Sequence, residues 1–322
     1  MKPQLKVREF DISNSRFEQG LSPTIQRILL SRGISSDAQL DQRLSTLFPP
    51  HELAGINAAV DLLEQALQRQ KSVLICGDYD ADGATATALV IRVLRAMGLE
   101  NIDFLVPNRF DFGYGLSPEL VAVAAESKPD LILTVDNGIS SVAGVAEARK
   151  RAIQVLVTDH HLPGSILPDA NAIINPNQPD CEFPSKNLAG VGVVFYLLIA
   201  LRARLRQSNW FEQHQLAEPR LENYLDIVAL GTVADLVPLD QLNRVLVSQG
   251  LKLLRSGLGN PGIKAILEVS GRDFSQTRST DLGFAVGPRI NAAGRLDDIT
   301  EGINCLLTDD TLEAHQHALG LH

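Results

Sequence analysis

The sequence predicts an α/β protein built on a doubly wound, mostly parallel sheet. Short apolar segments without polar alternation recur between residues 73 and 158, and segments with helical spacing of apolar residues separate them. Acidic residues and histidines directly follow three of these apolar segments. Buried parallel strands with ligand groups at their carboxyl ends are typical of doubly wound sheets.

Strands and helices are expected to alternate along this region. Residues 84–97 are rich in helix formers and end before Gly98, a suitable C-cap residue. Ser117 followed by Pro118 predicts a helix start, because serine caps a helix and proline fits its first turn. Further helices are expected at residues 56–70 and 142–151. The predicted strands are residues 73–76, 102–106, 131–135 and 153–158.

The chain divides into three parts by composition. Residues 1–50 mix short polar and apolar pieces and are expected to form an N-terminal extension, while residues 51–240 hold the predicted sheet. Beyond residue 175 the pattern becomes helical, so residues 241–322 are expected to form a helical C-terminal segment. The helices predicted after residue 175 are residues 189–206, 221–230, 243–255 and 261–269.

Composition excludes several classes of protein. Hydrophobic residues make up 45% of the 322 residues, yet no apolar stretch reaches the roughly 18 residues of a membrane-spanning helix. The N-terminus lacks the apolar part of a secretory signal, so a cytoplasmic protein without membrane contact is expected. Three scattered cysteines indicate neither a disulfide framework nor a zinc ribbon. The net charge of −9 argues against coating nucleic acid by bulk electrostatics.

Carboxylates and imidazoles gather where the predicted strands end. Because parallel strands end at the same edge of a sheet, segments far apart in the sequence converge there. The groups that follow the first, third and fourth strands are Asp78, Asp80, Asp82, Asp136, Asp159, His160 and His161. Their convergence predicts a single site.

Such a cluster favours bound metal. Carboxylates gathered without cations resist ionising together. Oxygen ligands with an occasional imidazole suit Mn²⁺ or Mg²⁺, and the nearby Cys76 lies inside a predicted buried strand. Two such ions about 3.5–4 Å apart can activate water and stabilise the oxygens of a phosphoryl centre. The residues therefore predict phosphodiester hydrolysis.

Two other motifs are only partial matches to known ligand-binding motifs. Residues 78–83 match the opening of an EF-hand loop, but its twelfth position is Leu89 where that loop needs glutamate. Gly190 and Gly192 begin like a dinucleotide fingerprint, but Phe195 stands in place of the third glycine and no strand directly precedes. Helix packing is the better interpretation of these glycines.

The acidic segments resemble a known family. Residues 77–83, 135–138 and 158–161 are similar to the first three motifs of the DHH phosphoesterases, and the third motif, Asp-His-His, names that superfamily. Residues 231–235 resemble its fourth motif, which nominates Asp235 as a further ligand. The residues alone would have left Asp235 as a helix end.

Two further segments, residues 107–116 and 287–295, narrow the resemblance to the RecJ-type single-stranded-DNA exonucleases. This resemblance implies hydrolysis of single-stranded DNA from the 5′ end to mononucleotides, in repair and recombination. It also implies accessory proteins, namely a single-strand-binding protein and a helicase. The alternatives are a phosphodiesterase for short oligonucleotides or cyclic dinucleotides, and an inactive scaffold in replication.

The resemblance also implies roles for individual residues. Two Mn²⁺ or Mg²⁺ ions would be held by Asp80, Asp82, Asp136, His160 and Asp235. Asp136 is the candidate bridging ligand, and His161 would contact the scissile phosphate. Asp78 and Asp159 would either bind metal directly or orient a ligand. The residues expected to contact the DNA are Arg109, Tyr114, Arg289 and Asn291, with the arginines on phosphates and Tyr114 on a base.

The chain departs from this family at its C-terminal end. RecJ-type enzymes continue through a long helix into a second, substrate-gripping domain, whereas this chain is expected to stop inside that helix, at residues 311–322. The expected consequence is a change in affinity and processivity more than in chemistry.

Overall fold

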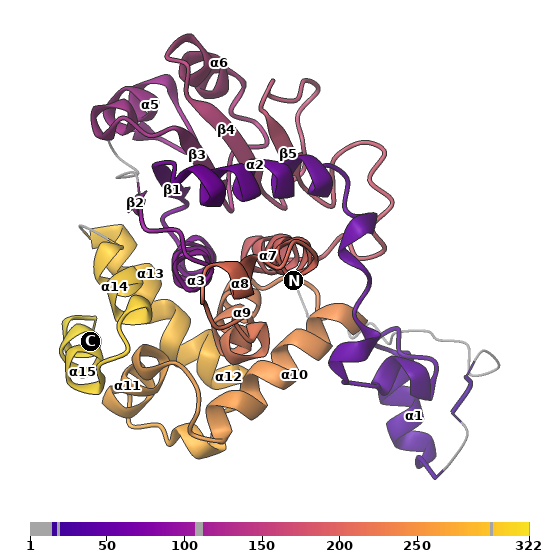
Figure 1. Ribbon diagram of the computed structural model, residues 1–322. Helices are drawn as coiled ribbons and strands as arrows, with labels where there is room; N and C mark the ends of the chain where they lie inside the picture. The colour runs from indigo at the N-terminus through magenta and orange to yellow at the C-terminus, as the bar shows by residue number, and fades with distance from the viewer. Residues whose placement is uncertain (1–14, 18–19, 107–111, 297–298, 322) are drawn as a thin grey trace, which may run out of the picture.

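The computed structural model describes residues 15–17, 20–106, 112–296 and 299–321. At its centre is a five-stranded sheet in the order β2-β1-β3-β4-β5, in which every neighbouring pair is parallel (Figure 1). The predicted α/β fold with a doubly wound parallel sheet is confirmed. The strands are β1 (Val73–Gly77), β2 (Ile102–Leu105), β3 (Leu131–Val135), β4 (Gln154–Thr158) and β5 (Ala172–Ile174).

Helices cover both faces of the sheet, which is why the central strands β1 and β3 are buried along their whole length. On one face, α5 (Pro118–Ala124) and α6 (Val142–Lys150) pack on side chains such as Ile132 and Val155. On the other face lie α2 (Ile56–Arg69), α3 (Ala81–Ala96) and α7 (Gly190–Gln207) (Figure 1).

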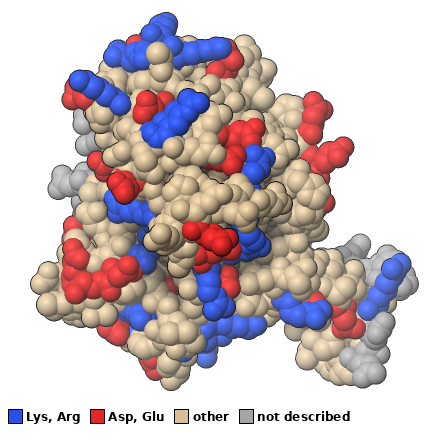
Figure 2. Space-filling view, viewed as in Figure 1, with Lys and Arg blue, Asp and Glu red and all other residues tan. Residues whose placement is uncertain are grey.

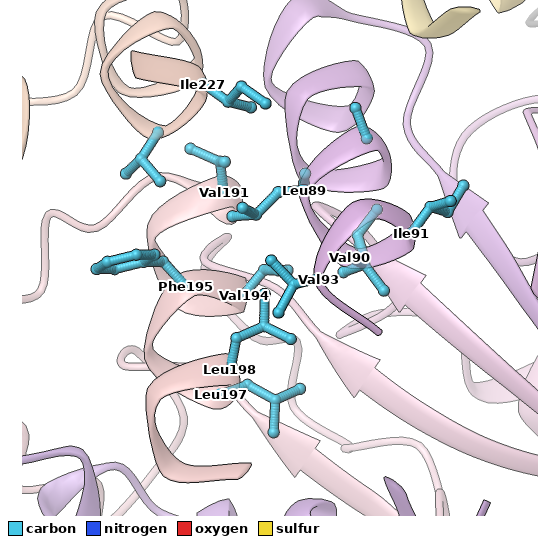
Figure 3. Packing of buried hydrophobic residues seen from close by; sticks show 14 of the residues in the cluster. Leu89, Val90, Ile91, Val93, Val191, Val194, Phe195, Leu197, Leu198 and Ile227 are labelled. Carbon is cyan, nitrogen blue, oxygen red and sulfur yellow. The ribbon is translucent and has the colours of Figure 1, made fainter. Parts of the chain in front are cut away.

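The main core lies between α3 and α7. Figure 3 shows Val93 of α3 beside Val194 and Leu198 of α7, with Ile227 approaching from α9 (Leu225–Ala234). Helix α7 is buried almost all round its N-terminal half, because it lies between the sheet and a further layer of helices. The interpretation of Gly190 and Gly192 as helix-packing residues agrees with this position.

The further layer is formed by α9, α10 (Gln241–Arg255), α11 (Pro261–Val269), α14 (Thr300–Leu307) and α15 (Thr311–Gly320) (Figure 1). Helix α9 packs against α3, α7 and α10. One apolar core runs from Leu53 to Leu321 without a break at residue 240, so the predicted domain boundary there stays a prediction. The remaining helices are α8 (Trp210–Gln213), α12 (Ser279–Asp281), the π-helix η8 (Leu282–Val286) and α13 (Gly287–Leu296), with short 3₁₀ turns at Ala125–Ser127, Leu221–Tyr224 and Phe274–Gln276.

The N-terminal segment lies against α10. It contains α1 (Pro23–Leu30) and three 3₁₀ turns, at Asp37–Leu40, Leu44–Thr46 and Pro50–Glu52. Arg244 Nη2 donates to the Gln39 carbonyl at 3.1 Å, and Ser248 Oγ donates to Gln42 Oε1 at 2.6 Å. Figure 1 shows α1 at the outer edge of the molecule, away from the sheet.

Charges of both signs are interspersed on the face shown in Figure 2, with Lys and Arg at the top, over α6, and again in the lower part of the view. This face shows no broad surface of a single charge sign, the kind of surface that binds nucleic acid through its overall electrostatic field. Among the described residues, no helix is long and apolar enough to cross a membrane.

Candidate metal centre

Three acidic segments leave the sheet at the same level. Gly77 pairs with Val135, and Val135 pairs with Thr158, so the next residue of each strand lies at one edge. The ladder extends one step further, since the Asp136 amide donates to the Thr158 carbonyl at 3.0 Å. The register therefore brings Asp78, Asp136 and Asp159 side by side, as the sequence predicted from strand ends alone.

The first acidic loop turns directly into α3. Asp80 caps the helix, because its Oδ1 accepts from the amides of Asp82 and Gly83, each at 2.9 Å. The helix therefore begins at Ala81 and not at residue 84, and the predicted start was wrong by one turn. A Cβ at Gly83 would lie 2.4 Å from the Asp78 carbonyl oxygen, so only glycine permits this tight turn.

His160 is the centre of one group of ligand atoms. Its Nε2 lies 3.1 Å from Asp136 Oδ1, 3.5 Å from Asp235 Oδ2 and 4.0 Å from Asp82 Oδ2. The atoms His160 Nε2, Asp136 Oδ1 and Asp235 Oδ2 are buried and have no hydrogen-bond partner among the described residues. Buried polar atoms are almost always paired, so three converging unpaired ones are what a metal site requires.

Asp78, Asp80 and Asp136 form a second group, with one oxygen of each lying within 4.8 Å of the others. Asp136 thus belongs to both groups. The donor set of aspartates with one or two imidazoles fits a pair of hard divalent cations such as Mn²⁺ or Mg²⁺.

The electrostatics of the cluster favour a cation. Burial raises the pKa of Asp136 well above its usual range, and the carboxylates of Asp82 and Asp80 raise it further. Burial likewise raises the pKa of Asp78 to about 7 and that of Asp235 to about 7. Positive charge between these groups is needed for them to ionise together at neutral pH.

The N-terminus of α7 holds the carboxylate of Asp82. The Gly190 amide donates to Asp82 Oδ2 at 2.6 Å, and the Val191 amide donates to Oδ1 at 3.0 Å. The partial positive charge of a helix start stabilises a carboxylate. A Cβ at Gly190 would lie 2.6 Å from the Asp136 Cβ, so this glycine lets α7 approach the site.

Asp159 is saturated by protein donors. Its Oδ2 accepts from the Ile139 amide at 2.9 Å, and its Oδ1 accepts from the amides of His160 and His161. The same Oδ1 lies 2.7 Å from His161 Nδ1. Burial raises the pKa of Asp159, but these hydrogen bonds outweigh it and the pKa lies below its usual value. Asp159 thus holds the His161 ring in this structure. Whether it binds metal or orients a ligand, the two roles that the sequence left open, stays a prediction.

His161 points toward solvent beside Tyr114. Its side chain is 44% exposed, and the Tyr114 hydroxyl lies 3.2 Å from its Nδ1. The hydrogen bond to Asp159 raises the pKa of His161. The Tyr114 ring packs edge-on against Tyr79. Tyr114, predicted to stack on a base, therefore lies next to the candidate phosphate-contacting imidazole, while Arg109 lies outside the described residues.

Two predicted substrate residues lie on α13. Arg289 Nη1 donates to the Ala285 carbonyl at 2.8 Å. Asn291 Oδ1 accepts from the Ala81 amide at 2.7 Å, directly between Asp80 and Asp82. Asn291 thus supports the acidic loop, and its predicted contact with substrate stays a prediction.

Two asparagines that the sequence analysis missed hold the histidine segment in place. Asn175 Nδ2 donates to the His161 carbonyl at 2.9 Å, and Asn177 Nδ2 donates to the His160 carbonyl at 2.6 Å. Both follow β5, so a correct prediction of that strand would have placed them at the same edge. Gly231 was also missed, and a Cβ there would lie 2.8 Å from Asp82 Oδ1.

Replacing Asn291 with alanine is expected to weaken Mn²⁺ binding about tenfold, the effect of losing an outer partner of the ligands. The matched control is Arg289→Ala on the same helix, which should weaken binding of a 5′-phosphorylated strand without changing Mn²⁺ affinity. Titration of Mn²⁺ by electron paramagnetic resonance measures the first effect, and fluorescence anisotropy of labelled DNA measures the second. Weaker DNA binding with unchanged Mn²⁺ affinity in Asn291→Ala would show that Asn291 contacts substrate instead.

The fold and the ligand groups define an α/β protein with a carboxylate-rich site for divalent metal ions. Residues 72–232 match the family described as "DHH family, N-terminal domain". That match covers half of the chain, and the chain belongs to the DHH family.

Similar proteins carry one recurring name. Single-stranded-DNA-specific exonuclease RecJ of Salmonella typhimurium is 54% identical over 97% of this chain, which spans about half (54%) of that relative's length. A crystal structure of exonuclease RecJ bound to manganese is 37% identical, with a TM-score of 0.72 over 84% of this chain and 65% of that one. RecJ of Thermus thermophilus in complex with Mg²⁺ is 30% identical, with a TM-score of 0.64 over 96% of this chain and 42% of that one. The predicted resemblance is confirmed.

Proposed function

We propose that this chain carries the catalytic site of a metal-dependent exonuclease that hydrolyses single-stranded DNA from its 5′ end to 5′-mononucleotides. The observation that supports this most is the set of unpaired buried atoms on Asp136, His160 and Asp235, which converge at the carboxyl edge of the sheet. The similarity to RecJ exonucleases over nearly the whole chain supports the choice of substrate. The direction from the 5′ end is proposed from the resemblance of residues 107–116 and 287–295 alone.

The ligand groups divide between two ions. Asp82, His160 and Asp235 would hold one ion, Asp78 and Asp80 the other, and Asp136 would bridge them. Mn²⁺ and Mg²⁺ both suit this donor set, and RecJ structures have been determined with each. When bound, such ions supply an activated water and stabilise charge on the phosphoryl oxygens.

The protein's own residues orient the phosphate. His161 is fixed by Asp159 on one nitrogen and adjoins the Tyr114 hydroxyl, so its exposed imidazole can donate to a phosphate oxygen. Arg289 and Arg109 would bind further phosphates through their planar guanidinium groups. Asn291 supports the acidic loop by accepting a hydrogen bond from the Ala81 amide.

We also propose where the reaction takes place and which proteins assist it. A single-strand-binding protein and a helicase are the accessory proteins that the RecJ resemblance implies, and the cytoplasm is the expected location. A role in DNA repair and recombination follows from the same resemblance. The chain spans about half of the length of its RecJ relatives.

The test supplies the purified chain with Mn²⁺ and a single strand labelled at either end, beside a duplex and a dinucleotide. Release of mononucleotides from the 5′ end of the single strand is expected, and chelation of the metal should stop it. Cleavage of the dinucleotide alone would favour a small-substrate phosphodiesterase. No cleavage of any substrate, with Mn²⁺ still bound, would favour an inactive scaffold.

A further inference from the structure

A cavity of about 270 Å³ lies beside His161 and Asp159. Its walls come from residues 114–118, residues 138–141 and the first turn of α6. Of the candidate metal-site residues, only His161 and Asp159 line the cavity. Both lie at the edge of the sheet. The cavity is therefore a separate space that adjoins the metal centre.

We propose that this cavity receives the sugar and base of the terminal nucleotide while the phosphodiester lies at the metal ligands. The proposal rests on the function proposed above and deepens it. His161 borders both spaces: its ring lies 4.4 Å from the His160 ring, between centroids, and it also lines the cavity. A phosphate bound by His161 thus has a place for its nucleoside directly beside it.

The chemistry of the walls fits a nucleoside. Leu116 and Ile139 are buried and provide apolar surface for a base or the carbon face of deoxyribose. Ser141 Oγ accepts from the Leu116 amide at 3.0 Å, which leaves its own hydrogen to donate to a ligand. Tyr114, half exposed at the rim, offers its ring to a base.

The side chains of these walls favour a nucleoside over a terminal phosphate. Among the described residues that line the cavity there is no lysine or arginine, and the Asp159 carboxylate borders it. Three backbone amides of this turn already have partners, since those of Ile139, Ser141 and Val142 donate to Asp159 Oδ2, the Gly138 carbonyl and the Ser140 carbonyl. A phosphate would find no cationic side chain among these described residues to balance its charge.

Binding of the terminal base in this cavity would explain why the DNA substrate has to be single-stranded. A base that enters this cavity cannot keep its pairing partner, so a duplex end must first open. The cavity has few fixed polar groups, so little preference among the four bases is expected. The cavity therefore selects for an unpaired terminal nucleotide and against a paired one.

The test substitutes Ala143, an exposed residue of the first turn of α6 that lines the cavity. Ala143→Phe places a ring in the cavity and is expected to raise KM for single-stranded DNA at least tenfold, with unchanged Mn²⁺ affinity and melting temperature. The matched control is Val142→Phe, because Val142 is its exposed neighbour and does not line the cavity. The control should behave as the wild type.

Substrate variants identify the occupant. In the wild type, a 5′-terminal abasic site is expected to raise KM, and in Ala143→Phe it should add no further change. Thymidine 5′-monophosphate should inhibit the wild type and bind the Ala143→Phe variant at least tenfold more weakly. Equal behaviour of the two phenylalanine variants would overturn the assignment. Loss of the preference for a 5′-phosphate, with the abasic effect retained, would show that the cavity holds phosphate instead.

A separate outcome concerns the proposed function itself. The wild type could bind thymidine 5′-monophosphate, with weaker binding in Ala143→Phe, and yet release no nucleotide from DNA. The exonuclease proposal would then fail while the cavity assignment stood. If the wild type degraded DNA while Ala143→Phe changed neither KM nor nucleotide binding, the cavity assignment would fail while the exonuclease proposal stood.

Discussion

Replacing Asp136 with asparagine is expected to lower the rate of DNA hydrolysis by at least about 10³-fold, a loss typical of a central catalytic group. Asp136 belongs to both groups of candidate ligand atoms, so the loss of its charge would weaken the binding of both ions. Asparagine suits the test because residue 136 has a φ of 63°, a left-handed conformation that asparagine adopts readily and alanine does not. Single-turnover kinetics with a 5′-labelled strand measure the effect.

The Asp136→Asn protein should stay folded, because the change relieves repulsion among buried carboxylates. Its melting temperature without metal should be equal to or above that of the wild type. Asp61→Ala is a control, since Asp61 pairs with Arg204 on the surface. A variant at residue 136 that kept most of its activity would show that the ligand assignment is wrong.

Replacing Gly190 with alanine is expected to weaken Mn²⁺ binding by about tenfold or more and to slow hydrolysis by a similar factor. The new Cβ would lie 2.6 Å from Asp136 Cβ and 2.7 Å from its Oδ1, so either the ligand or α7 must move. Moving α7 would also break the amide contacts with Asp82. Overpacking of this kind costs about 1–3 kcal/mol of stability. Isothermal titration with Mn²⁺ and thermal melting measure the two effects.

Gly192→Ala is the matched control on the same helix. There the new Cβ would meet Leu188 Cδ2 at 2.8 Å, which is the end of a flexible side chain that can turn aside. Mn²⁺ affinity should therefore change little in this variant. Equal losses in the two variants would mean that α7 tolerates no added volume in general and that its approach to Asp136 has no special role.

The strand ends were the part of the site that the sequence predicted well. Apolar segments gave the positions of β1, β3 and β4, and Asp78, Asp136 and Asp159 then followed from the rule that parallel strands end at one edge. Asp235 was different, because it stands at the end of α9 and no strand points to it. Only the resemblance to a family nominated it, and the structure brings it within 3.5 Å of His160.

The contacts that the sequence could not show are those between distant backbone and side-chain groups. Nothing local indicates that the amide of Gly190 donates to Asp82, since 108 residues separate them. The bond from Ala81 to Asn291 spans 210 residues and depends on how α13 packs. The strand β5 has only three residues, too few to show periodicity, and Asn175 and Asn177 were missed with it.

The position of Asp235 has a consequence for how the protein is made. The last strand of the sheet ends at residue 174, but the candidate ligand Asp235 reaches the site only when α9 has packed against α3 and α7. A nascent chain that has left the ribosome as far as β5 therefore lacks one member of the ligand set. Because domains fold as units during synthesis, the site cannot assemble before the helical layer does. The candidate metal centre is thus completed late in folding, after the sheet.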